Sequence, residues 1–191
     1  MGDRFAAAAK SLRRGALVVY PTDTLLGLGA LAGHRGAVRR LLSVKGRPSG
    51  LPVSVCVSST EEVERFARVS PTARRFLRRH LPGPFTVLLA PSPEGRRAFA
   101  PAIGGFRAVG FRVPDHPVAR ELARRAGPIT ATSANHHGAP PARTVAAARH
   151  ALGRAVAYYL PAHPAGSGVP STIVDLTGPV PREVDRRSGP G

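Results

Sequence analysis

The stretch Ala16-Leu17-Val18-Val19-Tyr20, followed directly by Pro21-Thr22-Asp23-Thr24, sets an apolar run against a polar turn. The apolar run predicts a buried strand over residues 16–20. The residues after it bring two hydroxyls and a carboxylate to the end of that strand. They make the turn a candidate binding loop, and capping by the hydroxyls is the alternative interpretation. Residues 25–31 continue as an apolar segment interrupted by glycines.

Outward from this stretch, segments with helical and strand spacing alternate along much of the chain. The pattern predicts helices over residues 3–14, 36–44, 61–68, 71–80, 117–126 and 144–152. It predicts further strands over residues 52–57, 85–90, 108–113, 129–132, 155–160, 171–176 and 180–184. This alternation favours an α/β fold with an open, twisted, mixed β-sheet flanked by helices. Active sites in such sheets gather in crevices near strand ends, on the connecting loops.

Length and composition narrow the class of protein. The chain has 191 residues, 42% of them hydrophobic, which suits one ordinary domain with a sizeable core. The single cysteine, Cys56, excludes an internal disulfide and a cysteine-based zinc site. No apolar run approaches the roughly 20 residues that span a bilayer, and the N-terminus has no signal-peptide pattern. A cytoplasmic location without membrane association is therefore the expectation.

The charge balance is strongly basic. Lys+Arg number 28 and Asp+Glu 11, which gives a formal net charge of +17, and only Lys10 and Lys45 are lysines. Such an excess suggests polyanionic partners, namely RNA, DNA or nucleotide phosphates. A base-composition bias toward Arg, Ala, Gly and Pro codons is the alternative, although it does not explain a lysine at position 45.

The predicted helix over residues 71–80 concentrates this charge on one side. Its arginines lie opposite the apolar positions and are Arg74, Arg75, Arg78 and Arg79. They form either a footprint for an RNA phosphate backbone or a solvated basic face. Aromatic residues make up 5% of the chain and tryptophan is absent, so base-stacking platforms are poorly supplied.

Two further loops have side chains suited to phosphate chemistry. Lys45-Gly46-Arg47-Pro48 sets two cations two residues apart; arginine can bind two oxygens at once, and lysine acts as a point charge. Ser133-Ala134-Asn135 places a hydroxyl and a carboxamide at alternate positions where a strand ends. Taken alone, the first fits a solvated basic loop and the second a turn held by its own side chains. Cys56, inside an apolar strand, is expected to pack rather than to act as a nucleophile.

In their order along the chain, these segments resemble the YrdC/TsaC-like family, the threonylcarbamoyl-AMP synthases. The matching segments are 20–29 (YPTDTLLGLG), 45–48 (KGRP), 81–86 (LPGPFT), 111–117 (FRVPDHP), 128–135 (PITATSAN) with Gly138, 170–176 (PSTIVDL) and 187–189 (RSG). They occur in register over residues 16–189, which is nearly the whole chain. The resemblance implies a single YrdC-like domain over residues 1–191, with a central concave groove in its sheet. The family's longer members add a C-terminal domain, for which this chain has no room.

The resemblance also implies a reaction, in which L-threonine, bicarbonate or CO2, and ATP give threonylcarbamoyl-AMP and pyrophosphate. A partner transferase would use the product to modify an adenosine beside the anticodon of certain tRNAs. Positioning and charge neutralisation would dominate such catalysis. Two alternatives remain: an RNA-binding or ribosome-associated module of the same fold, and a relative that forms a carbamoyl-adenylate from carbamoyl phosphate.

The matched motifs imply roles for particular residues. The catalytic and ATP-binding set around the triphosphate and carbamate is Lys45, Arg47, Ser133 and Asn135. Arg187 would hold the nucleotide from the C-terminal segment. The L-threonine pocket would be formed by Thr24, Arg112 and Ser171. Mg²⁺ would be bound mainly by ATP phosphates, with no metal site built by the protein.

Three positions depart from the family's pattern. Leu26 stands where the family usually has tyrosine, which removes a hydroxyl and an aromatic wall. Cys56 stands where many members have histidine, so no ligand role is expected there. Ser188 replaces the usual proline.

Overall fold

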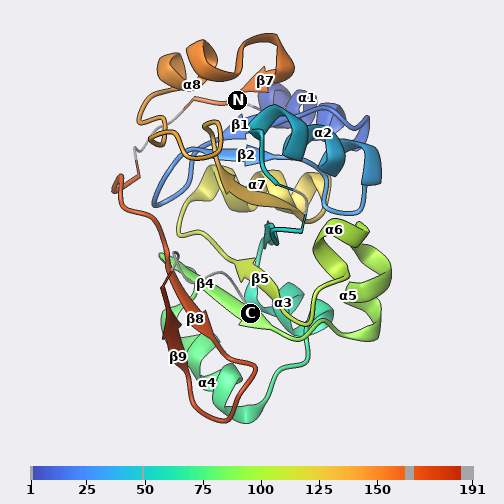
Figure 1. Cartoon of the computed structure of the whole chain (residues 1–191), viewed down its shortest axis with the longest axis vertical. Coiled ribbons are helices and arrows are strands. Elements are labelled where there is room, and N and C mark those ends of the chain that lie inside the picture. The colour runs from blue at the N-terminus through green and yellow to red at the C-terminus, as the bar shows by residue number, and fades with distance from the viewer. Residues whose placement is uncertain (1, 49, 162–165, 186–191) are drawn as a thin grey trace.

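A mixed β-sheet runs through the computed structural model, which describes residues 2–48, 50–161 and 166–185. Across these residues the sheet has nine strands, in the order β7-β1-β2-β6-β3-β5-β4-β8-β9 (Figure 1). The strands are β1 (Val18–Tyr20), β2 (Gly27–Gly29), β3 (Ser54–Cys56), β4 (Phe85–Leu89), β5 (Val109–Arg112), β6 (Ile129–Ser133), β7 (Tyr158–Tyr159), β8 (Thr172–Asp175) and β9 (Arg182–Val184). The predicted fold class, an open mixed sheet flanked by helices, is confirmed.

The order of the strands departs from their order in the sequence. Strand β6 pairs with both β2 and β3, so that Ser133 lies opposite Gly27 and Ile129 lies opposite Cys56. Strand β5 pairs in parallel with β3, which sets Arg112 opposite Cys56. The sheet therefore joins segments that are far apart in the sequence, such as those of Cys56 and Arg112 or of Gly27 and Ser133, and carries their loops to a shared region.

Helices flank the sheet on both faces. They are α1 (Gly2–Arg13), α2 (Arg35–Lys45), α3 (Thr60–Phe66), α4 (Pro71–His80), α5 (Pro93–Ala98), α6 (Pro101–Gly104), α7 (Pro117–Ala126) and α8 (Val145–Leu152), with a 3₁₀ turn η1 (Gly153–Ala155). All the predicted helices and strands are present, with bounds shifted by a few residues. Strand β2, the turn η1 and helices α5 and α6 were not predicted. Each of these two helices is short and begins at a proline, which suits a first helical turn.

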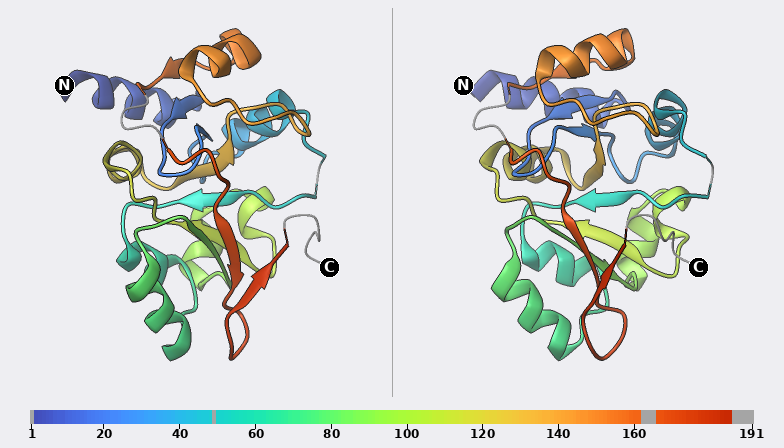
Figure 2. Two further views of the ribbon diagram at one scale, coloured as in Figure 1. Left: turned by 90° about the vertical axis from the view of Figure 1, so that its left-hand side faces the viewer. Right: turned by 60° about the vertical axis from the view of Figure 1, so that its left-hand side comes forward.

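Apolar side chains of the described residues form three buried clusters. One packs α1 and α7 against one face of β1, β3 and β6, and includes Tyr20 and Cys56. A second packs α2 and α8 against the other face of β1 and β2. The third packs helices α3 to α6 against β3, β4, β5 and β8. In Figure 2 the chain enters β8 from the end of the molecule that holds β1, β2 and β7. Among the described residues, no helix is both long and apolar enough to cross a membrane.

Candidate active site

Lys45 is the last residue of α2, and its side chain is buried. The sequence suggested an exposed loop here, which is wrong, because α2 continues through Lys45 and ends at Gly46. Gly46 adopts the left-handed conformation, with a φ of 60°, and its N–H bonds to carbonyls of the last helical turn. Lys45 is only 3% exposed, so its charge lies inside the protein.

The ammonium group of Lys45 contacts the strand end that bears Ser133 and Asn135. Its Nζ donates to the backbone oxygens of Ser133, at 2.6 Å, and Asn135, at 2.7 Å, and lies 3.3 Å from Oδ1 of Asn135. The Ser133 hydroxyl donates to the same Oδ1, while Nδ2 of Asn135 donates to the backbone oxygen of Ala139. The structure therefore brings together three of the four residues predicted for phosphate binding.

Lys45 and Arg47, on either side of the end of α2, have no acidic partner among the described residues. Nη2 of Arg47 donates to the backbone oxygen of Pro52 at 2.8 Å, and its buried Nε has no hydrogen-bond partner there. Burial, together with repulsion from Arg47, lowers the pKa of Lys45 to about 8. Burial also lowers the pKa of Arg47. Positive charge that meets only neutral oxygens is suited to a polyanionic ligand.

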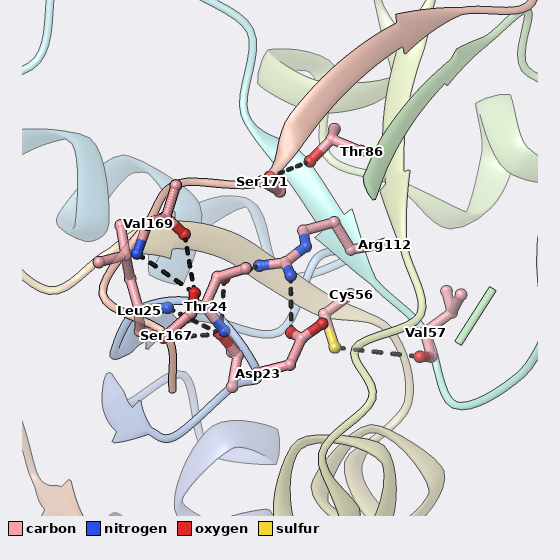
Figure 3. A network of polar contacts seen from close by, with 11 residues as sticks. Asp23, Thr24, Leu25, Cys56, Val57, Thr86, Arg112, Ser167, Val169 and Ser171 are labelled. Carbon is pink, nitrogen blue, oxygen red and sulfur yellow. Dashed lines mark hydrogen bonds and ion pairs between the residues drawn. The ribbon is translucent and has the colours of Figure 1, made fainter. Parts of the chain in front are cut away.

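A second cluster surrounds Arg112 at the end of β5 (Figure 3). Nη1 of Arg112 donates to Oγ1 of Thr24 at 3.0 Å, and Nη2 forms an ion pair with Oδ1 of Asp23 at 2.8 Å. Oγ1 of Thr22 lies 3.0 Å from Oγ1 of Thr24 and accepts from the N–H groups of Thr24 and Leu25. The turn after β1 is thus held to β5 by a buried polar network.

Ser171 lies where the chain enters β8. Its hydroxyl is 2.8 Å from that of Thr86 on β4, and both residues are buried. The segment before it crosses the turn after β1: the N–H groups of Ser167 and Gly168 donate to the backbone oxygens of Asp23 and Thr24, at 2.9 and 2.8 Å (Figure 3). The approach requires glycine at Gly166, because a Cβ there would lie 2.5 Å from the Thr24 oxygen.

Two neighbouring cavities lie beside these clusters; Asn135 of the first cluster lines one, and Thr22 and Thr24 of the second line the other. One, of about 480 Å³, is lined by Thr22, Thr24, Leu25, Leu26, Ala142, Arg143, Thr144, Val145, Tyr159, Pro161, Gly166 and Gly168. The other, of about 360 Å³, is lined by Ala134, Asn135, His136, Ala139, Pro140, Pro141, Ala142, Arg143, Thr144, Ala147 and Ala151. Residues 142–144 border both cavities. A ligand in one cavity therefore lies beside a ligand in the other.

Some residues of the site were missed by sequence reasoning, and others lie outside it. Asp23 was grouped with the turn, but its ion pair with an arginine 89 residues away left no signal in the sequence. Arg143 lines both cavities and is one arginine among many. Burial raises the pKa of the Cys56 thiol to about 12, so it stays protonated and packs in the core. Arg187 and Ser188 lie outside the described residues.

The fold and this site define an α/β protein with a cationic cluster at the end of α2 and a buried, ion-paired polar cluster at the end of β5, each beside one of two neighbouring cavities. The chain belongs to the Sua5/YciO/YrdC family, whose profile, described as telomere recombination, matches residues 10–188. The resemblance seen in the sequence motifs is thereby confirmed.

Relatives of this chain are named as threonylcarbamoyl-AMP synthases. The chain is 42% identical over 185 residues to a putative threonylcarbamoyl-AMP synthase of Mycobacterium tuberculosis, covering 96% of this chain and 83% of the relative. It is 35% identical over 181 residues to the threonylcarbamoyl-AMP synthase of Bacillus subtilis, covering 93% of this chain and 51% of the relative. The family is therefore one whose named members are enzymes.

Solved structures agree with the fold. Pyrococcus abyssi Sua5 in complex with L-threonine matches with a TM-score of 0.85 and 32% identity, over 94% of this chain and 52% of that one. Escherichia coli YciO matches with a TM-score of 0.82 and 26% identity, over 96% and 89%. The chain thus spans about half the length of the Bacillus and Pyrococcus relatives and most of the length of YciO.

Proposed function

We propose that this chain is an L-threonylcarbamoyladenylate synthase, a nucleotidyltransferase that forms threonylcarbamoyl-AMP and pyrophosphate from L-threonine, bicarbonate or CO2, and ATP. The names of its relatives and the threonine complex of Pyrococcus Sua5 support the proposal. One observation carries it: a buried lysine that meets only neutral oxygens contacts Asn135, and the cavity that Asn135 lines adjoins a cavity lined by Thr24, the hydrogen-bond partner of the ion-paired Arg112. Such a site suits a polyphosphate and an amino acid side by side.

The phosphate cluster would hold the triphosphate. Lys45 and Arg47 would neutralise charge on the phosphates, while Ser133 and Asn135 would orient them through hydroxyl and amide groups. Arg187 would hold the nucleotide from the C-terminal segment. Mg²⁺ would be bound mainly by phosphate oxygens, because the donors in this cluster are cations and neutral groups, which suit phosphate rather than a metal.

The cluster around Arg112, beside the cavity that Thr24 lines, would hold threonine. Arg112 suits the substrate carboxylate, and the hydroxyls of Thr24 and Ser171 suit its amine and hydroxyl groups. The threonine ammonium would first give one proton to water; its nitrogen would then bond to the carbon of CO2 and release a second proton, which leaves an N–H carbamate. An oxygen of the resulting carbamate would then attack the α-phosphorus, and the bond to pyrophosphate would break. The role of the protein would be to align these groups and neutralise charge.

The product would pass to a downstream threonylcarbamoyl transferase complex, which modifies the adenosine next to the anticodon of certain tRNAs. The chain would accordingly act in the cytoplasm, in tRNA processing. Weak RNA binding would follow from the arginine excess and is not required for the reaction.

Pyrophosphate release tests the proposal. The purified chain would be incubated with ATP and Mg²⁺, with threonine, serine or carbamoyl phosphate, each with and without bicarbonate. We expect release with threonine only when bicarbonate is present, and a preference for threonine over serine of about 10- to 200-fold, the worth of one methyl group in a fitted pocket. Leu26, in place of the usual tyrosine, favours the lower half of that range.

Each other outcome has a consequence. Equal rates with serine and threonine would contradict the pocket assignment. Activity with carbamoyl phosphate alone would move the chain to the carbamoyl-adenylate alternative. No release with any substrate, together with tight RNA binding, would favour the RNA-module alternative.

A further inference from the structure

The cluster around Arg112, whose Thr24 lines the larger of the two cavities, contains one acidic and one basic side chain that form a pair. The ion pair between Asp23 and Arg112 is nearly buried, with side chains 12% and 9% exposed. Water screens such a pair little, so each charge acts strongly on a ligand beside it. One positive and one negative charge leave the pair with no net charge, unlike the purely cationic cluster around Lys45.

Each member of this pair also keeps one unsatisfied polar atom. Among the described residues, Oδ2 of Asp23 is buried without a hydrogen-bond donor, and Nε of Arg112 is buried without an acceptor. Buried polar atoms without partners are rare in folded proteins because desolvating them costs free energy. The pair thus lacks one donor at its acidic end and one acceptor at its basic end.

We propose that Asp23 is a specificity-determining residue that selects an α-amino-acid zwitterion over a simple hydroxy acid. An ammonium group supplies the donor that Oδ2 of Asp23 lacks, and a carboxylate one carbon away supplies the acceptor for Arg112. A hydroxy acid without an amine offers the carboxylate alone, and its charge faces the repulsion of Asp23. The inference rests on the proposed function, because it concerns the amino-acid substrate of the same pocket.

The backbone around Asp23 supports a fixed placement of its carboxylate. The backbone oxygen of Asp23 accepts a hydrogen bond from the N–H of Ser167. The next residue, Thr24, accepts from the N–H of Gly168 through its backbone oxygen and from Arg112 through its hydroxyl. Figure 3 shows Asp23 and Thr24 on the same turn, facing the Arg112 guanidinium. The turn is therefore held from β5 on one side and from the 166–168 segment on the other.

Binding of three ligands to the unaltered full chain, without ATP, gives the first test. L-Threonine has both charged groups, 3-hydroxybutyrate lacks the ammonium, and L-threoninol lacks the carboxylate. Calorimetric titration should give a dissociation constant for threonine at least tenfold below that of either analogue, roughly 1.4 kcal/mol. Equal affinity for 3-hydroxybutyrate and threonine would overturn the inference, whatever the variants do.

Variants then assign the selectivity to Asp23. Asp23→Asn should raise the dissociation constant of threonine roughly tenfold and leave that of 3-hydroxybutyrate unchanged or lower, so that the preference for threonine nearly disappears. Asp23→Glu, which keeps the carboxylate, should restore most of it. Asp175→Asn, an isosteric change in β8 where the carboxylate caps Thr177, is the matched control and should keep the wild-type preference.

The outcomes separate this inference from the proposed function. If Asp23→Asn weakens all three ligands by the same factor, as measured on protein with native circular dichroism, Asp23 has only a structural role and the inference fails. If the unaltered chain releases pyrophosphate with threonine but binds 3-hydroxybutyrate equally well, the inference alone fails. If none of the amino acids supports pyrophosphate release, the proposed function fails. The binding of the three ligands still shows whether the cluster around Arg112 prefers a zwitterion.

Discussion

Two buried cations, Lys45 and Arg112, lie in neighbouring parts of the molecule and are compensated in opposite ways. Lys45 meets three neutral oxygens, whereas Arg112 meets the carboxylate of Asp23. A buried charge without a counterion is costly, and a buried ion pair much less so. The difference teaches which ligand each region can take: the first gains from an added anion, and the second from a molecule that is itself neutral overall.

The lowered pKa of Lys45 expresses this cost. At neutral pH the lysine stays charged although its surroundings disfavour the charge, because its value falls only to about 8. A phosphate group beside Nζ would reverse that effect and raise the pKa. Ligand binding would then offset the free energy that it costs to bury the charge of Lys45 without a counterion. The local instability of this cluster in the free protein is therefore linked to its function.

Among the changes considered, replacing Lys45 by methionine should have the largest effect on the rate of pyrophosphate release. Lys45→Met keeps the length of the side chain and removes the only charge that α2 directs at Ser133 and Asn135. We expect pyrophosphate release to fall about a hundredfold, or about 3 kcal/mol in transition-state stabilisation. The melting temperature should change little, because the lost hydrogen bonds are offset by removal of an uncompensated charge.

The only other lysine supplies the control. Lys10→Met removes an exposed charge on α1 and should leave both rate and melting temperature unchanged. Near-wild-type turnover of the Lys45 variant would contradict the assigned role. A large drop in its melting temperature would mean that Lys45 serves the fold instead.

The sequence could predict the elements of this fold but not the environment of each charge. Apolar periodicity is a local signal, so it located nearly all helices and strands. Whether Lys45 lies in a loop or a buried helix end depends on the left-handed turn at Gly46 and on β6, which lies about 90 residues away. The segment over 93–104 carries little apolar periodicity, and its two short helices form on the core of β3, β4 and β5.

The same limit applies to the candidate site. Motifs identified Thr24, Arg112 and Ser171 as one set, and the structure joins the first two directly by a hydrogen bond. No motif could show that Arg112 is already paired with Asp23, since the pairing depends on the turn after β1 lying across the end of β5. Roles that rest on Arg187 remain predictions, because that residue lies outside the described part of the chain.

A smaller effect should appear in the pH dependence of the same lysine. If the charged form of Lys45 binds phosphate, kcat/KM for ATP should be flat below pH 8 and fall about tenfold per unit above it. Below the ordinary lysine value of 10.5 the unfolded chain keeps its proton, while the folded chain loses it near 8. The folded state binds fewer protons in this window, so the contribution of Lys45 to stability rises with pH.

These opposite directions separate loss of charge from unfolding. Pyrophosphate assays from pH 6.5 to 9.5, with urea unfolding of the wild type and Lys45→Met over the same range, would measure both. The unfolding free energy of the wild type should increase relative to that of Lys45→Met as the pH rises through about 8, while the activity of the wild type falls. Activity and stability falling together would contradict the assignment.

The smallest expected effect concerns arginines on the surface of α4, where paired and unpaired cations again differ. Arg74 forms an ion pair with Glu64 at 3.1 Å, whereas Arg78 is exposed and has no acidic partner among the described residues. We expect weak, sequence-indifferent RNA binding that falls steeply with salt, because counterion release drives it. An unpaired arginine is free to contact a phosphate, so Arg78→Ala should reduce the slope of log K against log salt by about 0.7 to 0.9.

Arg74→Ala is the matched control for this last change, since it removes the same side chain one turn away on the same helix. Its effect on the slope should be smaller, because Glu64 already pairs with Arg74 and competes with RNA phosphates for its charge. After the substitution the Glu64 carboxylate is unpaired, and it repels a phosphate only at close range. Fluorescence anisotropy with a tRNA and an unrelated RNA, at several salt concentrations, would give both slopes. Equal slopes for the two variants would mean that pairing does not decide which arginines reach a phosphate. Tight tRNA binding that hardly depends on salt would instead favour a specific RNA interface, and with it the RNA-module alternative.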